Sequence, residues 1–110
     1  MKSNELRIGN YYIDEDGEQH TFDWGVMSWM DWDYCKPIPI TNEWLVKFGF
    51  KTSNEKVGWY KKRDFKYTSR LVSFGLKICL IDGGRHYEIK TCKYIHELQN
   101  FYYIIENKEL

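Results

Sequence analysis

Short strand-like runs separated by glycine turns fill residues 57–90, and this alternation restricts the fold more than any other feature of the chain. Aromatic and aliphatic side chains alternate there with polar ones, a pattern that is typical of antiparallel strands. Asp82-Gly83-Gly84 can supply the positive backbone φ of a tight hairpin turn. The pattern predicts a four-stranded antiparallel meander over residues 59–61, 65–68, 76–81 and 86–89.

Two helices are predicted beside this meander. Pro37 and Pro39 fix an extended joint, after which Thr41 can cap a short helix that ends near Gly49. Near the C-terminus, apolar residues recur at the spacing of an amphipathic helix, and Thr91 is its expected cap. The apolar residues of that helix are Tyr94, Ile95, Leu98, Phe101, Tyr102 and Ile105.

The N-terminal third of the chain is predicted to form a β-hairpin region. Leu6 and Ile8 alternate with polar residues, Gly9-Asn10 supplies a turn or bulge, and residues 11–13 resume an extended run. Asp16-Gly17 can then form the turn into a long aromatic run over residues 19–32. The whole chain then has the pattern of an α+β fold: a small single domain, with twisted antiparallel sheets, a short central helix, and an amphipathic C-terminal helix packed on the sheet. We expect one domain over residues 1–110, with a hairpin region (1–36), a Pro-rich joint and short helix (37–50), and a meander plus C-terminal helix (51–110).

The composition predicts a folded cytoplasmic protein without a cofactor. Hydrophobic residues make up 43% of the 110 residues and aromatic residues 18%, which is too apolar for a disordered chain. Charges occupy the N-terminus where a signal peptide needs an apolar stretch, and no apolar run is long enough to span a membrane. Cys35, Cys79 and Cys92 form no Cys-x-x-Cys pair, which suits a reducing compartment.

Charge is balanced overall but not along the chain. The formal net charge is +0, so a strongly basic character does not argue for nucleic-acid binding. Residues 1–50 carry four Lys/Arg against nine Asp/Glu, net −5, whereas residues 51–110 carry twelve against seven, net +5. The two halves could complement each other within the fold, or each could attract a partner of opposite charge.

An aromatic and acidic segment, residues 22–34, is the first candidate surface. It contains more large apolar groups than one face of a strand can bury, with carboxylates among them and hardly a cation nearby. Trp and Tyr anchor protein interfaces, and the carboxylates suit a basic nucleic-acid channel on a partner protein. The simpler interpretation is that most of these rings fill the core. The expected partner-binding residues are Trp24, Trp29, Asp31, Trp32, Asp33 and Tyr34.

A second candidate surface interleaves aromatic and basic residues over residues 56–70. Bases of single-stranded RNA stack on aromatic rings while cations neutralise the phosphates. The competing interpretation is a hairpin with its aromatic residues inward and its lysines outward. The expected RNA-binding residues of this alternative are Trp59, Tyr60, Lys61, Lys62 and Lys66.

Enzymatic chemistry is not expected. His20 and His86 could act as an acid–base pair on RNA, but no phosphate-binding loop and no recognisable nucleophile accompany them. His96 and Glu97 begin like a zinc-protease helix, yet Asn100 occupies the position of the second histidine ligand. Asp14 and Asp16 lie in a turn, which favours Asp without any metal. We therefore expect no catalytic residue, no metal site and no cofactor.

Three blocks of the sequence are similar to a known group of proteins. They read NELRIGN at residues 4–10, PIPITNEWL at 37–45 with KFGF at 47–50, and YIHELQNFY at 94–102. In these blocks, roughly 30 residues, the chain resembles a family of small Bacteroidetes phage and prophage proteins to which no catalytic residues are assigned. The chain departs from that family in its Trp-rich stretch.

The resemblance implies a function in the bacterial host cell. Phages of these hosts meet RNA-targeting CRISPR systems of type VI-B, and small phage proteins that inhibit CRISPR effectors are a known category. The leading hypothesis is therefore a binding protein that inhibits a host defence nuclease, such as a type VI-B effector ribonucleoprotein, through the Trp-rich acidic segment. The alternative is a single-stranded RNA-binding module that uses residues 56–70.

Overall fold

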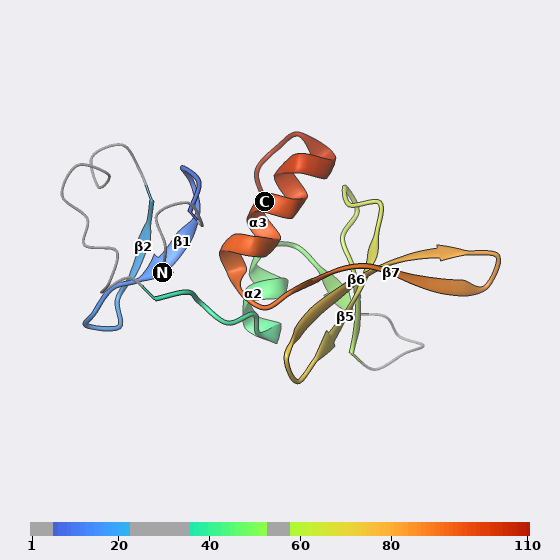
Figure 1. Cartoon of the computed structure of the whole chain (residues 1–110), viewed down its shortest axis with the longest axis horizontal. Helices are drawn as coiled ribbons and strands as arrows, with labels where there is room; N and C mark the ends of the chain where they lie inside the picture. Colours follow the sequence, from blue (N-terminus) through green and yellow to red (C-terminus); the bar gives the residue numbers. More distant parts are fainter. Residues whose placement is uncertain (1–5, 23–35, 53–57) are drawn as a thin grey trace. The chain divides into compact units, whose positions relative to one another are not determined.

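The computed structural model describes residues 6–22, 36–52 and 58–110 (Figure 1). They form a two-stranded and a five-stranded antiparallel sheet with two helices, which confirms the predicted α+β class. The chain groups into two compact units, residues 1–39 with 94–110 and residues 40–93. The first boundary, between residues 39 and 40, lies at the Pro-rich joint. The second, between residues 93 and 94, separates the C-terminal helix from the meander, whereas the prediction from sequence placed both in one region, residues 51–110.

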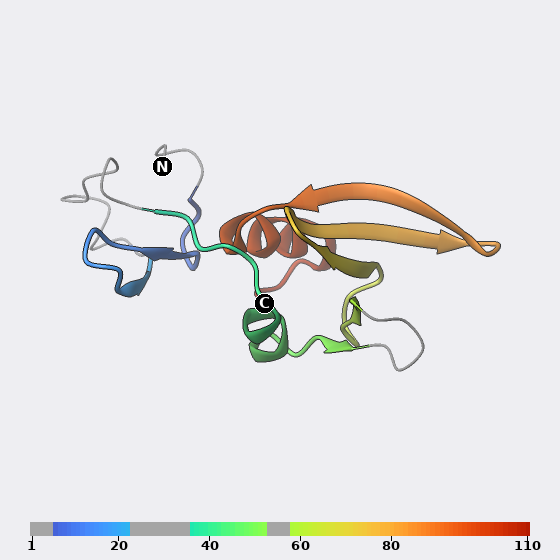
Figure 2. The same ribbon diagram turned by 90° about the horizontal axis from the view of Figure 1, so that it is seen from below.

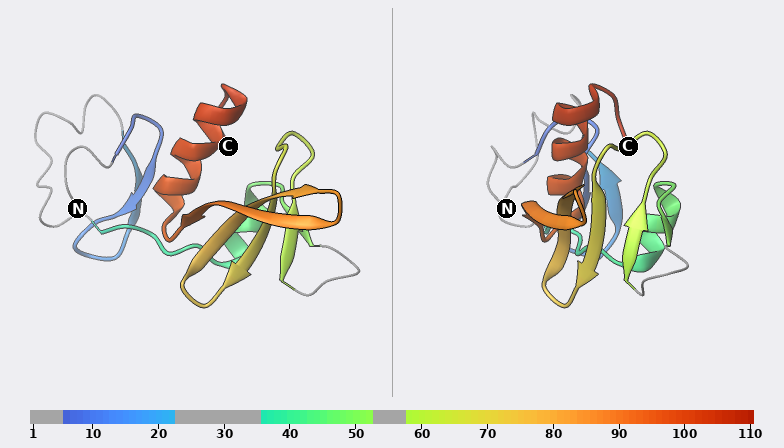
Figure 3. Two further views of the ribbon diagram at one scale, coloured as in Figure 1. Left: turned by 45° about the vertical axis from the view of Figure 1, so that its right-hand side comes forward. Right: turned by 90° about the vertical axis from the view of Figure 1, so that its right-hand side faces the viewer.

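In the first unit, β1 (Tyr11–Ile13) and β2 (Gln19–Thr21) form the predicted hairpin, with Tyr12 opposite His20 (Figure 3). Before this hairpin the chain turns at residues 8–9, within one residue of the turn expected at Gly9-Asn10, but residues 6–8 do not form the expected strand. The Asn10 side chain accepts a hydrogen bond of 2.6 Å from the Arg7 backbone N–H. Such a local bond favours a turn over a strand.

The C-terminal helix α3 (Ile95–Glu106) belongs to this unit and contacts β1. Ile95, Leu98 and Tyr102 are buried, as the apolar spacing predicts. Thr91 is not the cap, because β7 continues through it to Cys92. The first turn of the helix is instead held by the Glu97 carboxylate, which accepts a hydrogen bond of 3.0 Å from the Tyr94 N–H.

The second unit begins with α2 (Asn42–Lys47), where the sequence places the short helix. Thr41 is the predicted cap, and its hydroxyl oxygen accepts a hydrogen bond from the Trp44 N–H at 3.4 Å. Leu45 is completely buried. The chain then returns over the helix, where the Phe50 N–H donates to the Leu45 carbonyl at 2.9 Å.

A five-stranded antiparallel sheet follows, with its strands in chain order. Gly83 and Gly84 have φ of 58° and 80° and form the predicted hairpin turn (Figure 2). The prediction lacked the first strand, which has two residues, and it began the third strand at residue 65 instead of Thr68. Phe65 has the apolar character of a strand residue because it belongs to the core, but it lies before that strand begins. The strands are β3 (Lys51–Thr52), β4 (Trp59–Lys61), β5 (Thr68–Val72), β6 (Gly75–Asp82) and β7 (Arg85–Cys92).

One face of this sheet is the core of the second unit. Tyr60 lies opposite Ser69, and Ser69 lies opposite Ile78, in the register of β4, β5 and β6. All three residues are buried, as are Leu76 and Cys92 on the same face. Because successive strand residues point to opposite faces, their neighbours must lie on the other side of the sheet. Among the described residues, no helix is long and apolar enough to cross a membrane.

Candidate nucleic-acid interface

The face of the five-stranded sheet opposite this core is polar, and we call it the outer face. Its register places Lys51 opposite Lys61, and Trp59 opposite Arg70, which in turn lies opposite Lys77. Residues opposite each other in an antiparallel register share a face. The described members of the outer face that are exposed or half-buried are Lys51, Trp59, Lys61, Thr68, Arg70, Val72, Lys77, Ile81, His86, Glu88 and Thr91.

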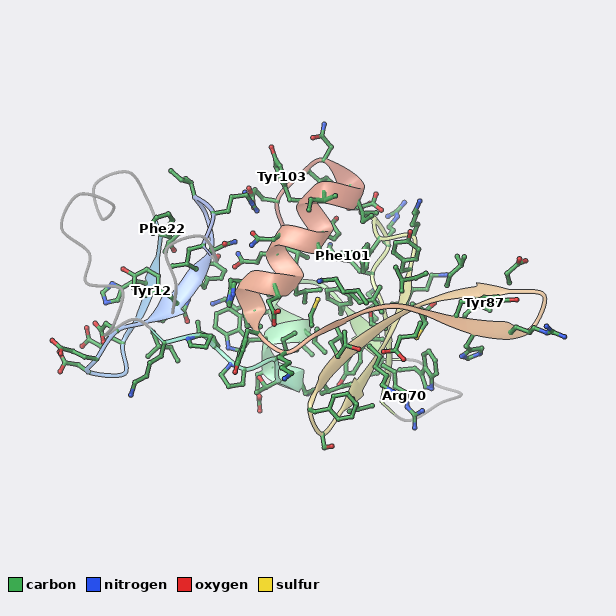
Figure 4. The ribbon with its side chains drawn as sticks, in the orientation of Figure 1. Tyr12, Phe22, Arg70, Tyr87, Phe101 and Tyr103 are labelled. Atoms are coloured by element: carbon green, nitrogen blue, oxygen red, sulfur yellow. The ribbon has the colours of Figure 1, made fainter. Side chains whose placement is uncertain are left out.

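Trp59 is the aromatic centre of the outer face. The His86 ring meets it edge-on, with 4.8 Å between ring centroids and 87° between the planes. The guanidinium carbon of Arg70 lies 5.9 Å from the centroid of the Trp59 ring (Figure 4). β4 and β7 are not neighbours in the sheet, and the twist of the β6–β7 hairpin, visible in Figure 1, accompanies the contact of His86 with Trp59. The register shift between Ile78 and Cys79 is a β-bulge, which increases twist.

Cations outnumber carboxylates on the outer face. Lys61 and Arg70 are exposed, whereas Lys77 lies 3.8 Å from the Glu88 carboxylate. Glu88 also accepts a hydrogen bond of 2.7 Å from the Thr91 hydroxyl. Cys79 lies beneath these residues, and its burial, together with the Glu88 charge, raises the pKa of its thiol. Among the described residues, the outer face therefore offers one Trp ring with four cations and a single carboxylate.

The charge asymmetry along the sequence becomes larger when it is counted by structural unit. The unit of residues 40–93 carries twelve Lys/Arg against five Asp/Glu, a net charge of +7. The unit of residues 1–39 with 94–110 carries four against eleven, a net charge of −7. The outer face thus belongs to a strongly basic body, although the chain as a whole is neutral.

The structure places most of the predicted RNA-binding residues at the surface. Trp59 and Lys61 both lie on the outer face. Lys66 is exposed in the loop before β5, with its Nζ atom 5.2 Å from the centroid of the Tyr67 ring. Lys62 follows β4 and is half-buried. Four of the five predicted residues are therefore exposed or half-buried, and their binding to RNA stays a prediction.

Tyr60 is the exception, and the prediction for it is corrected. Its side chain is 5% exposed and faces the core, where its hydroxyl donates a hydrogen bond of 2.5 Å to the Asn42 side-chain oxygen. The physical reason is the alternation of a strand: Trp59 and Tyr60 are adjacent, so they cannot both point outward. A base cannot stack on Tyr60 in this fold.

Sequence reasoning included Arg70 at the end of the aromatic and basic run without naming it as an RNA-binding residue, and it missed Lys77. Both come from strands that follow β4 in the sheet: the register places Arg70 opposite Trp59, and Lys77 opposite Arg70. His86 was considered only as a catalytic group. The one signal in the sequence is that Arg70 ends the aromatic and basic run; nothing local indicates that it lies opposite Trp59.

The six residues predicted to bind a protein partner lie outside the described residues. Trp24, Trp29, Asp31, Trp32, Asp33 and Tyr34 all belong to residues 23–35. The use of this segment as a protein interface stays a prediction.

The histidines have different surroundings. The His20 ring is 2.6 Å from the Asp14 carboxylate, whereas His86 packs on Trp59 in the other unit. The Asp14 carboxylate also accepts the backbone N–H groups of Asp16 and Glu18, and these contacts lower its pKa, with the His20 bond as the main cause. In the described part of the chain, Asp14, Glu18 and His20 form the one group of three metal-ligand side chains. Their exposure and mutual bonds are explained by the turn alone.

His96 and Asn100 have structural positions in α3. His96 is 4% exposed and stacks on Tyr94 with 5.9 Å between ring centroids, so it does not lie on the helix surface. The Asn100 side-chain oxygen accepts hydrogen bonds from Arg7 and Asn10, at 3.1 and 2.9 Å. Asn100, which occupies the second ligand position of the zinc motif, therefore helps to hold the N-terminal segment through these hydrogen bonds.

Comparisons with protein-family models, with curated proteins and with solved structures found no match to this chain. Its function is therefore argued from the outer face and from the charge of the two units.

Proposed function

We propose that the five-stranded sheet binds single-stranded RNA on its outer face. The observation that carries this proposal is the position of Trp59 beside Arg70, on an exposed sheet face within a unit of net charge +7. An aromatic ring offers a stacking surface to any base, and the surrounding cations neutralise phosphates along the strand. The proposal involves binding without catalysis.

The chemistry of the outer face favours a single strand over a duplex. Bases must leave their own stack before they can stack on a side chain, which loops and single strands allow. Lys61 and Arg70 are exposed on neighbouring strands and can follow a backbone past Trp59. Of the residues that the structure describes on this face, Glu88 alone is acidic, and Lys77 lies 3.8 Å from its carboxylate. We therefore expect binding with little sequence preference and a strong dependence on salt.

Fluorescence anisotropy with a labelled 12-nucleotide single-stranded RNA, titrated over a salt series, tests the proposal. Trp59→Ala should weaken binding by roughly 5- to 150-fold, which corresponds to about 1 to 3 kcal/mol for one stacked base. Arg70→Gln removes one phosphate contact, so the slope of log affinity against log salt should become shallower by about 0.7. A duplex of the same sequence should bind more weakly than the single strand.

Two control variants separate the outer face from the rest of the chain. Lys36→Gln removes an exposed cation from the acidic unit and should leave both affinity and salt slope unchanged. Tyr60→Phe removes the core hydroxyl, so it should lower stability without changing RNA affinity. Binding that is absent, insensitive to salt, or equally strong in Trp59→Ala would refute the proposal.

A second candidate function is inhibition of a host defence nuclease, such as a type VI-B CRISPR effector, by direct binding. The supporting observation is the net charge of −7 on the unit that contains the Trp-rich segment. Such a charge suits the basic channel of a nucleic-acid-binding protein. This proposal also relies on the resemblance of residues 4–10, 37–50 and 94–102 to the phage and prophage family.

The two candidates differ in what a tagged chain recovers from a host lysate. A protein partner that remains after nuclease treatment supports the inhibitor, and Trp29→Ala with Trp32→Ala should then abolish its recovery. RNA that is recovered without a protein, and lost in Trp59→Ala, supports the RNA-binding sheet alone. If the double variant folds and retains the protein partner, the Trp-rich segment is not the interface.

A further inference from the structure

The distal half of the β6–β7 hairpin extends beyond its neighbours in the sheet. β5 pairs with β6 only as far as Cys79, whereas β6 and β7 remain paired to Asp82 and Arg85 (Figure 2). Every residue from 80 to 90 is exposed. Four of them are large and hydrophobic: Leu80, Ile81, Tyr87 and Ile89 are 40 to 47% exposed. Grouped apolar exposure of this kind marks an interaction surface.

β7 also has an open edge. It is the last strand of the sheet, so within the described residues it has a strand neighbour on one side only. The N–H and C=O groups of such an edge can pair with another extended chain. The bulge at Ile89, which lies between the paired residues Glu88 and Lys90, confines regular pairing to residues 85–88.

The side chains of this edge are complementary to themselves. When two identical strands pair antiparallel about a two-fold axis through Tyr87, each Tyr87 faces its own copy and each His86 faces Glu88 of the second copy. Leu80 lies opposite Tyr87 within the hairpin. One face of the joined sheets would therefore carry an apolar row of Leu80, Tyr87, Tyr87 and Leu80. An axis through Glu88 would instead place two carboxylates opposite each other, which is unfavourable.

We propose that two copies of this chain associate through β7, with Tyr87 on the two-fold axis. The joined sheets bury the Leu80 and Tyr87 side chains that a single copy leaves in water, and His86 and Glu88 form two equivalent polar pairs. Because few residues pair, the dimer is weak and forms at high protein concentration. Tyr87 and Leu80 point away from the outer face, whereas His86 and Glu88 belong to it, so the dimer and the proposed RNA binding share these two residues.

Cysteine cross-linking of the full chain tests the register directly. Residues opposite each other in an antiparallel pair have Cα atoms about 4.5 to 5.5 Å apart, within the range that a disulfide bridges. Tyr87→Cys should therefore form a covalent dimer under mild oxidation. Ile104→Cys is the matched control, because Ile104 is 76% exposed on α3, and the wild type controls for the native cysteines. Cross-linking of Tyr87→Cys no faster than either control would overturn the proposal.

Sedimentation equilibrium over a concentration series measures the association itself. Tyr87→Lys places two like charges on the axis and should raise the dimer dissociation constant at least about tenfold, while Ile104→Lys should leave it unchanged. His86→Glu alone should weaken the dimer, and adding Glu88→Lys should restore it by reversing both pairs. A wild type that stays monomeric, or a dimer that persists in Tyr87→Lys, would show that β7 does not pair in this way.

Discussion

Gln99→Leu should destabilise the unit that contains α3. The Gln99 side chain is 2% exposed, and it fastens the helix to the N-terminal hairpin. Its side-chain oxygen accepts a hydrogen bond of 2.9 Å from the Tyr11 N–H, and its nitrogen donates to the Gly9 carbonyl at 3.1 Å. Leucine is similar in size but makes neither bond, so the substitution leaves two backbone groups without these partners.

The magnitude follows from those two bonds. Leaving a buried polar group without its hydrogen bond costs about 1 to 3 kcal/mol. Tyr11 and Gly9 are only half-buried, which places each cost toward the lower part of that range. We expect a total loss of roughly 2 to 4 kcal/mol, against a typical stability of about 5 to 15 kcal/mol for a domain.

Urea denaturation followed by circular dichroism measures the loss, and hydrogen exchange locates it. With a urea m-value of about 1 to 3 kcal/mol/M, the midpoint should fall by about 1 M or more. Amides of residues 6–13 and 95–106 should exchange faster, while those of β5 and β6 should not. Ile104→Gln, at an exposed position of the same helix, should change stability by less than about 0.5 kcal/mol. A Gln99→Leu protein as stable as this control would refute the reasoning.

Three further outcomes are expected. The hydrogen bond from His20 lowers the pKa of Asp14 in the folded protein. The stability that this bond gives is therefore fully present above the unfolded pKa of about 3.9 and is lost as the pH falls through the lower folded pKa. His20→Ala should raise the pKa of Asp14 in an NMR titration. An unchanged Asp14 pKa would contradict this. Gly75→Ala should lower the free energy of unfolding in urea by about 3 kcal/mol or more. Gly75 has φ +146°, and a Cβ atom there would lie 2.5 Å from the Cys92 carbonyl oxygen. A variant of near-native stability would argue against this strain. Burial raises the pKa of Cys79, so mass spectrometry should find it alkylated at least about tenfold more slowly in the native than in the urea-unfolded chain, and equal rates would disagree.

Part of the candidate site was accessible to sequence reasoning. The run of aromatic and basic residues identified β4 and the loop after it, because composition alone marks a surface suited to nucleic acid. The same run could not assign both Trp59 and Tyr60 to one face, since adjacent strand residues point in opposite directions. Sequence reasoning named both as binding residues, whereas in the structure Tyr60 is buried in the core.

The sequence by itself determined the local elements. Thr41 caps α2 through a side chain that bonds a backbone N–H three residues away, and Gly83-Gly84 forms a turn that needs only its own φ angles. The C-terminal helix follows from its apolar spacing. These features depend on neighbours close in the chain, so a single sequence contains all the information they need.

Only the tertiary structure decided which residues meet. Arg70 lies beside Trp59 through the register of two strands, and His86 reaches the same ring through the twist of a bulged hairpin. The grouping of α3 with the N-terminal hairpin rests on Gln99, 88 residues away from Tyr11 along the chain. The register and the twist of a sheet depend on the packing of the whole core. An alternating pattern in the sequence therefore shows which residues share a face of a strand, but it does not show which of the two faces is exposed for binding.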